Sequence, residues 1–157
     1  MTDEELAQLL AEQRTLHAAT VSPDGSPHVV PLWFVWHQGA IWINNLRRSR
    51  RSRDVAAGSS VALCIDAGVQ YAELRGAVLY GHFEEATEDA LLPGVRAAFA
   101  RKYWGGNEVP DIRSHVWLRL EPERIASWDF RKIPAGRDRR LEGAKQARAG
   151  EGPGAGA

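Results

Sequence analysis

The sequence predicts a mostly β fold, in which about six antiparallel strands close into a small barrel with helices at its flanks. Short apolar segments with strand-like composition recur along the chain, and turn-forming residues separate most of them. Two glycines, Gly76 and Gly81, interrupt the longest of these segments, as the bends of a barrel require. Several segments are apolar on both faces, which indicates that a partner chain covers the outside of the barrel.

The first third of the chain predicts one helix followed by a three-stranded meander. TDEELAQLLAEQR has one apolar stripe, and its Thr2 and Glu5 have the spacing of a capping box, so we expect a helix there. The expected strands that follow are LHAATVS, HVVPLWFVWH and AIWINN. PDGSP and HQG join them as turns, because Pro presets φ and Gly accepts positive φ.

The remainder predicts further strands, a short helix and a longer helix. SRRSRDVAAG predicts the short helix, with Ser49 as its N-cap and Gly58 as its C-terminal stop. We expect strands in SVALCIDA and YAELRGAVLYGHFEEA, a helix in TEDALLPGVRAAFARKYW, and one or two strands in SHVWLRLEPERIASWDF. Residues 134–157 are rich in Gly, Ala and charge without apolar periodicity. They predict a disordered tail, which leaves residues 1–133 as one domain.

The composition argues against several classes of protein. Basic and acidic residues balance at 20 each, so the overall charge does not favour a nucleic-acid or membrane partner. No apolar run is long enough for a membrane span, and the acidic amphipathic start does not resemble a signal peptide. The single cysteine, Cys64, lies in an apolar strand and predicts a buried thiol in a reducing compartment. We therefore expect a cytoplasmic protein.

An unusual concentration of positive charge follows the third expected strand. Residues 44–53 are NNLRRSRRSR, with five arginines within seven positions. The N-terminus of a helix already has about half a positive charge, so arginines there repel it unless an anion is bound. Backbone N–H groups, serine hydroxyls and guanidinium groups together suit a phosphate, which Arg binds in a bidentate manner.

Other interpretations of the arginine run remain open on spacing alone. The arginines would also be stable in a turn where water solvates their charge, or in ion pairs with Asp54, Glu84 and Glu85. A nucleic-acid-binding patch is a weaker alternative, because the rest of the chain offers no further basic stripe.

The order of motifs resembles a known family. ATVSPDGSPHVVPLWFVWHQGAIWINN, SRRSRDVAAGSSVALCID and YAELRGAVLYG are similar to the pyridoxamine 5′-phosphate oxidase-like, split β-barrel flavin and deazaflavin oxidoreductases, over about residues 15–82. WDFRK at 128–132 resembles the closing strand of that family. The resemblance implies a six-stranded antiparallel split β-barrel and a homodimer with the cofactor at its interface.

The resemblance also implies which residues contact the cofactor. Ser49, Arg50 and Arg51 would hold its phosphate, with Arg51 where the family often has Lys and Asp54 where Asn is usual. Val30, Pro31, Leu32 and Trp33 would lie along the ring, and Asn44 and Asn45 would face the ribityl chain. Trp128 matches a position near the cofactor. Pro31 has no N–H, so its strand cannot be fully paired there, which leaves room for a ring.

The resemblance implies hydride transfer to an unsaturated small-molecule acceptor, with the cofactor supplying the redox chemistry. Coenzyme F420 is the expected cofactor, since the HVVPLWFVW strand and the short chain are closer to the deazaflavin branch, and FMN is the alternative. A non-catalytic cofactor or heme binder with the same fold is a further alternative. No catalytic residue is identified, although His28 and Tyr71 are candidate proton donors by type. The histidines lack metal-ligand spacing, so we expect no metal site.

Overall fold

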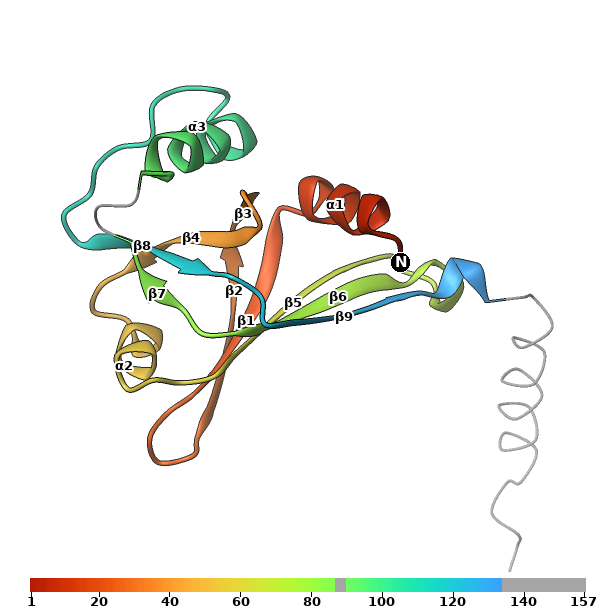
Figure 1. Cartoon of the computed structure of the whole chain (residues 1–157), viewed down its shortest axis with the longest axis horizontal. Coiled ribbons are helices and arrows are strands. Elements are labelled where there is room, and N and C mark those ends of the chain that lie inside the picture. Colours follow the sequence, from red (N-terminus) through yellow and green to blue (C-terminus); the bar gives the residue numbers. More distant parts are fainter. Residues whose placement is uncertain (87–89, 134–157) are drawn as a thin grey trace, which may run out of the picture.

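The computed structural model describes residues 1–86 and 90–133, and within them the chain forms two antiparallel sheets (Figure 1). The five-stranded sheet has the order β2-β1-β5-β6-β9, with β1 (Thr15–Val21), β2 (Pro27–Trp33), β5 (Val61–Ala67), β6 (Arg75–Gly81) and β9 (Arg124–Asp129). The four-stranded sheet has the order β3-β4-β8-β7, with β3 (Val35–His37), β4 (Ala40–Leu46), β7 (Glu84–Glu85) and β8 (His115–Leu120). The predicted mostly β, antiparallel fold with flanking helices is confirmed.

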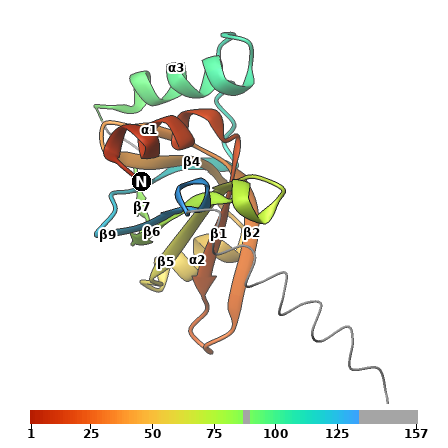
Figure 2. The same ribbon diagram turned by 90° about the vertical axis from the view of Figure 1, so that its right-hand side faces the viewer.

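Three α-helices flank the sheets: α1 (Asp3–Glu12), α2 (Arg50–Ala56) and α3 (Leu92–Tyr103). Two short 3₁₀ helices, η1 (Tyr71–Glu73) and η2 (Phe130–Lys132), lie together where β6 begins and β9 ends. Figures 1 and 2 show α1 and α3 at one end of the molecule and α2 at the other. The tail expected over 134–157 lies outside the described residues.

The predicted ends of α1 and α2 are confirmed by their hydrogen bonds. Thr2 Oγ1 accepts a bond from the Glu5 N–H at 3.3 Å, and Glu5 Oε2 accepts one from the Thr2 N–H at 2.7 Å. Ser49 Oγ accepts a bond from the Ser52 N–H at 3.1 Å, and Gly58 follows α2 with a φ of +77°. Local capping chemistry therefore fixes both helices.

The described part of the chain has nine strands rather than about six. Two segments expected as single strands are divided, and the segment over 114–130, expected to hold one or two strands, holds two. The segment expected as one strand over 28–37 leaves the five-stranded sheet after Trp33 and enters the four-stranded sheet at Val35. Phe34, between them, is fully buried, and its backbone bonds to the Tyr103 hydroxyl instead of to a strand. The segment over 71–86 is likewise divided, into η1, β6 and β7, and the segment over 114–130 forms β8 and β9.

The main core lies on one face of the five-stranded sheet and contains the apolar side of α1. Leu16 and Ala18 of β1, Leu63 of β5 and Leu79 of β6 are at most 1% exposed there. A second cluster packs α3 against the four-stranded sheet through Trp42, Val95 and other buried side chains. Strand alternation therefore leaves the opposite face of the five-stranded sheet pointing outward.

Candidate functional site

The helix α2 begins at Arg50, is capped by Ser49, and buries the side chain of its second residue, Arg51. Arg51 is only 6% exposed, and its Nε donates to Asn45 Oδ1 at 2.8 Å. Its Nη2 bonds to the same oxygen. Burial lowers the pKa of the Arg51 guanidinium, because desolvation disfavours the charged form.

No carboxylate neutralises Arg51 within residues 1–86 and 90–133. Asp54 is also buried, at 1% exposed, but it accepts hydrogen bonds from Thr20 Oγ1 and Ser22 Oγ, both at 2.7 Å. Those two bonds lower the pKa of the Asp54 carboxyl. Burying a charged group costs free energy unless an opposite charge pairs with it. The corner around α2 therefore lacks a negative charge beside Arg51.

The other arginines of the cluster lie on the surface. Arg47 Nη1 forms an ion pair with Glu85 Oε1 at 2.8 Å, so the pairing interpretation holds for this one residue. Arg50 Nε donates to Ser22 Oγ at 3.1 Å, which ties Arg50 through a hydroxyl to the Asp54 carboxylate. Within the described chain, Arg48, Arg50 and Arg53 have no ion pair. Most arginines of the cluster therefore have no ion-pair partner among the described residues.

Two hollows flank α2. One, of about 540 Å³, is lined by Arg50 and Arg53 together with residues of the β1–β2 turn and Asp54. The other, of about 430 Å³, has Arg47 and Ser52 at its polar side and Phe83 and Val116 among its apolar walls. Both volumes lie in the range of small-molecule sites, roughly 300–1,000 Å³.

Asn44 and Asn45 occupy adjacent positions on β4 and face opposite sides of it. Asn45 is fully buried toward α2, where its Nδ2 donates to Ser52 Oγ at 2.7 Å. Asn44 shares the other face with Trp42, and its buried Oδ1 has no hydrogen-bond partner among the described side chains. The structure therefore does not place the two amides on a common ligand, and Asn45 is the one at the arginine cluster.

The segment Val30–Trp33 lies on β2, which is an edge strand of the five-stranded sheet. Val30 and Leu32 pair with the inward-facing Ala18 and Leu16, so they point to the core side, whereas Pro31 and Trp33 point outward. Trp33 is half-exposed, and its ring stacks on the Tyr103 ring with centroids 4.6 Å apart and planes 7° apart. The backbone of this segment is open along one side.

The outward face of the five-stranded sheet is largely apolar. Register places two adjacent rows across the strands, in which His17, Tyr80 and Arg124 are the polar members: Val29, Ala19, Ala62, Tyr80 and Arg124, and Pro31, His17, Cys64, Val78 and Ala126. We call these residues the outer face. Val29 is 59% exposed, and Cys64 is only half-buried rather than fully buried as expected. Burial and the nearby Asp66 raise the pKa of the Cys64 thiol.

Trp128 belongs to the same side of the sheet, but it lies far from the arginine cluster. It pairs with Gly76, which in turn pairs with Asp66 on β5. Asp66 is roughly 16 Å along the strand from Val61, the end nearest α2. The described chain therefore does not bring Trp128 to the Arg51 corner.

The sequence interpretation missed three contributors to this region: Ser22, Asp54 as a hydrogen-bonded anchor, and Tyr103. The alternation in LHAATVS was a usable signal for Asp54, since it places Thr20 on the inward face beside α2. Nothing local predicted the pairing of Tyr103 with Trp33 and Phe34, which lie about seventy residues earlier in the chain.

Two further properties bear on the chemistry. Side chains of His, Cys, Asp and Glu do not gather in groups of three or more that could hold a metal ion, as far as the chain is described. None of the described helices has the length and apolar content needed to cross a membrane.

Comparison with solved structures finds proteins of the same fold. A conserved hypothetical protein from Mycobacterium tuberculosis is 27% identical, with a TM-score of 0.75 over 85% of this chain and 88% of that one. An F420 reductase is 22% identical, with a TM-score of 0.59 over 76% and 94% of the two chains. The heme storage protein from Vibrio cholerae is 18% identical, with a TM-score of 0.66 over 81% and 93%. The last two show the fold alone. No curated protein matches the chain.

The family comparison covers most of the sequence. The model described as pyridoxamine 5′-phosphate oxidase matches residues 2–129, which contain α1, α2, α3, all of the described strands and the arginine cluster. The split-barrel resemblance of the sequence motifs is thereby confirmed, and the chain belongs to the pyridoxamine 5′-phosphate oxidase family, whose split-barrel fold also serves an F420 reductase and flavin- and heme-binding proteins.

Proposed function

We propose that this protein is a homodimeric, cytoplasmic reductase that uses coenzyme F420 to transfer hydride to an unsaturated small-molecule acceptor. The family to which the chain belongs is named for an oxidase, and an F420 reductase has the same fold, which supports the class of activity. The reduced ring supplies the hydride when it is bound, and the protein binds, orients and shields it. FMN is the alternative cofactor.

The observation on which the proposal depends is the buried, unneutralised guanidinium of Arg51. A cofactor phosphate at this corner would supply the missing negative charge, and charge-assisted bonds of this kind are the strong ones. Ser49 and Ser52 at the start of α2 and the exposed Nη groups of Arg50 would complete the binding site. The residues present therefore fit a phosphorylated cofactor.

The ring would lie against the open edge of β2 beside Pro31 and Trp33. The outer face next to that edge is largely apolar, and a second copy of the chain would cover it. Trp128 and Arg51 are far apart within one chain, but in such a dimer Trp128 of one protomer would lie near Arg51 of the other. The ring would then be enclosed between two chains.

One feature favours F420 over FMN, and the fold is compatible with either cofactor. Arg48 and Arg53 are exposed and, in the part of the chain described, have no ion-pair partner, so they are free to meet the glutamate tail that F420 has and FMN lacks.

Equilibrium titration of the purified protein with F420, FMN and heme tests the proposal. We expect tight F420 binding, weaker FMN binding, and a loss of at least about tenfold in F420 affinity in Arg51→Gln, since a bond to a charged group contributes roughly 1.5–3 kcal/mol. Arg131→Gln, which removes a surface arginine of η2 that pairs with Asp129 and lies outside α2, is the matched control. Turnover of candidate acceptors with reduced F420 then tests catalysis. Preference for heme, or equal affinity in Arg51→Gln, contradicts the proposal.

A further inference from the structure

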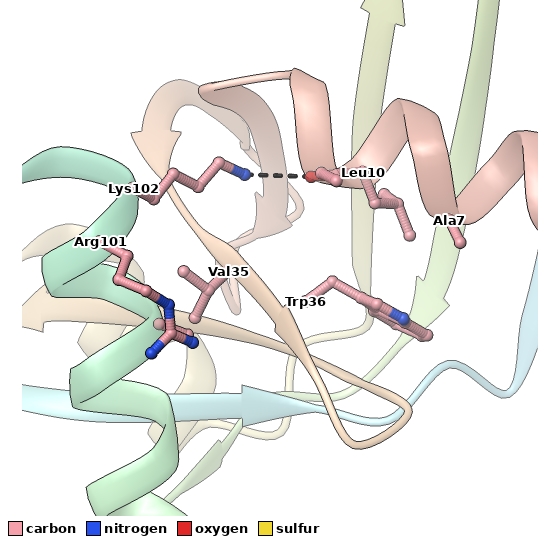
Figure 3. Close-up of a pocket in the computed structure, with 8 residues that line it drawn as sticks. Ala7, Leu10, Val35, Trp36, Arg101 and Lys102 are labelled. Carbon is pink, nitrogen blue, oxygen red and sulfur yellow. Dashed lines mark hydrogen bonds between the residues drawn. The ribbon is translucent and has the colours of Figure 1, made fainter.

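A third pocket lies between α1 and α3, at the end of the molecule opposite α2 (Figures 1 and 3). Its volume is about 330 Å³, near the lower end of the range for small-molecule sites, roughly 300–1,000 Å³. Val35 and Trp36 of β3 form its floor, and Leu10 and alanines of the two helices line its sides. Figure 3 shows Arg101 and Lys102 on the α3 wall, facing Ala7 and Leu10 on the α1 wall.

The charged side chains of this pocket are all cations. Arg101 and Lys102 are the charged members of the lining, and Arg14 lies close to Lys102, over the same Tyr103 ring. Among the residues that the structure describes, none of these three cations has a carboxylate partner. Lys102 Nζ donates to the Leu10 carbonyl at 3.0 Å and lies 4.0 Å from the centre of the Phe34 ring, so its contacts leave its charge unneutralised.

Desolvation penalises this arrangement. Burial, with a smaller contribution from Arg14, lowers the pKa of the Lys102 ammonium from 10.5 to about 8. Arg101, by contrast, is exposed, and its guanidinium has no hydrogen bond with the described residues, so it can contact a ligand. The pocket therefore offers an apolar floor, one half-buried cation and one free cation on the same wall.

We propose that this pocket is a binding site for a small amphipathic monocarboxylate, with its apolar group on Val35 and Trp36 and its carboxylate between Arg101 and Lys102. The ligand would neutralise the two adjacent cations and cover the apolar floor in one step. The site is separate from the α2 corner and does not depend on a bound cofactor.

Two probes of nearly the same shape, one charged and one neutral, test this site: phenylacetate and phenylacetamide. Each is titrated into the ¹⁵N-labelled full chain, and the Trp36 indole N–H cross-peak, assigned by its loss in Trp36→Phe, reports binding. We expect a saturable shift of this peak by phenylacetate and an affinity for phenylacetamide at least about tenfold weaker. Absence of a saturable shift, equal affinity for the two probes, or a phenylacetate shift confined to residues of α2 overturns the proposal.

Charge-removing variants on α3 separate recognition from packing. Lys102→Gln keeps a donor for the Leu10 carbonyl, and Arg101 is a surface side chain, so the double variant Arg101→Gln/Lys102→Gln should fold. We expect it to lose the preference for phenylacetate. Arg96→Gln, on the same helix but bonded to the Val109 carbonyl outside the pocket, is the control and should keep the preference. If the double variant does not fold, Arg101→Gln alone should reduce the preference, and an unchanged preference in a folded variant contradicts the assignment.

Discussion

The hydroxyl of Tyr103 takes the place of a neighbouring strand for Phe34, at the residue where the chain passes from one sheet to the other. Tyr103 Oη accepts a hydrogen bond from the Phe34 N–H at 3.0 Å and lies 2.7 Å from the Phe34 carbonyl oxygen. It also lies 2.7 Å from the carbonyl oxygen of Arg14, so α3 ties together β2, β3 and the segment after α1. Burial is the main cause that raises the pKa of Tyr103 to about 12, and the hydroxyl therefore remains protonated at neutral pH.

Tyr103→Phe should destabilise the fold by about 1–3 kcal/mol, because it leaves the buried N–H of Phe34 without a partner. Urea unfolding measures the change. Tyr71→Phe is the control, since the Tyr71 side chain is half-exposed and its ring, not its hydroxyl, contacts Phe130. Equal stability of Tyr103→Phe and the control would show that solvent or another group replaces the hydroxyl.

The ammonium of Lys102 should make the stability of the protein rise with pH between about 8 and 10.5. Its pKa is about 8 in the folded chain and 10.5 without the fold, so in this window the unfolded chain binds more protons than the folded one. Below the window the desolvation penalty is fully present, and above it the penalty is gone. The groups that face this ammonium are Arg14, the Leu10 carbonyl and the rings of Phe34 and Tyr103.

Comparison with Lys102→Gln isolates this contribution, because the other titrating groups are common to both proteins. In urea unfolding at a series of pH values, wild type should gain stability relative to Lys102→Gln as pH rises from 8 to 10.5. A difference that stays constant across the window would mean that Lys102 titrates at its ordinary pKa.

Gly76 should not tolerate a side chain, because Trp128 lies across it. A Cβ at Gly76 would overlap the Trp128 ring and lie 2.9 Å from the Ile65 carbonyl oxygen. Gly76→Ala should therefore cost about 1–3 kcal/mol in unfolding free energy. The cost should be smaller in a Trp128→Ala background, where the ring is gone and the contact with Ile65 remains. The same cost in both backgrounds would rule out the ring as its cause.

Val29→Glu should convert the expected dimer to monomers. Val29 is 59% exposed on the edge strand β2, where it belongs to the outer face, and burying an unpaired carboxylate costs several kcal/mol, enough for at least about a hundredfold weaker association. Analytical ultracentrifugation measures the change. Val69→Glu, at a residue that is 87% exposed and outside the strands, should remain dimeric. A Val29→Glu protein that is still dimeric would exclude the outer face as the interface.

Local chemistry made the starts of α1 and α2 and the end of α2 predictable, whereas the third helix begins at Leu92, later than the TEDALLPG segment predicted, and contacts distant in sequence decided the strand boundaries. Thr2 with Glu5 and Ser49 with Gly58 fix α1 and α2 within a few residues of themselves. The break at Phe34 depends on Tyr103, a residue 69 positions later, and no pattern within HVVPLWFVWH contains that information. The number of strands was therefore underestimated although the fold class was confirmed.

The sequence predicted that the arginine cluster is a binding site, but it did not predict which of the side chains are buried, paired or exposed. Strand alternation alone implies that Asn44 and Asn45 face opposite sides, so this separation was predictable. The burial of Arg51 was not predictable, because it depends on the packing of α2 on β4 and on the hydrogen bonds that Thr20 and Ser22 donate to Asp54. The resulting uncompensated cation is visible only in three dimensions.

A crystal structure of the protein with bound F420 gives the most direct test of the central claim. We expect the cofactor phosphorus within hydrogen-bonding reach of the Arg51 guanidinium, with the ring on the β2 edge beside Pro31. A bound cofactor whose phosphate lies away from α2, with Arg51 still bonded to Asn45 alone, would contradict it.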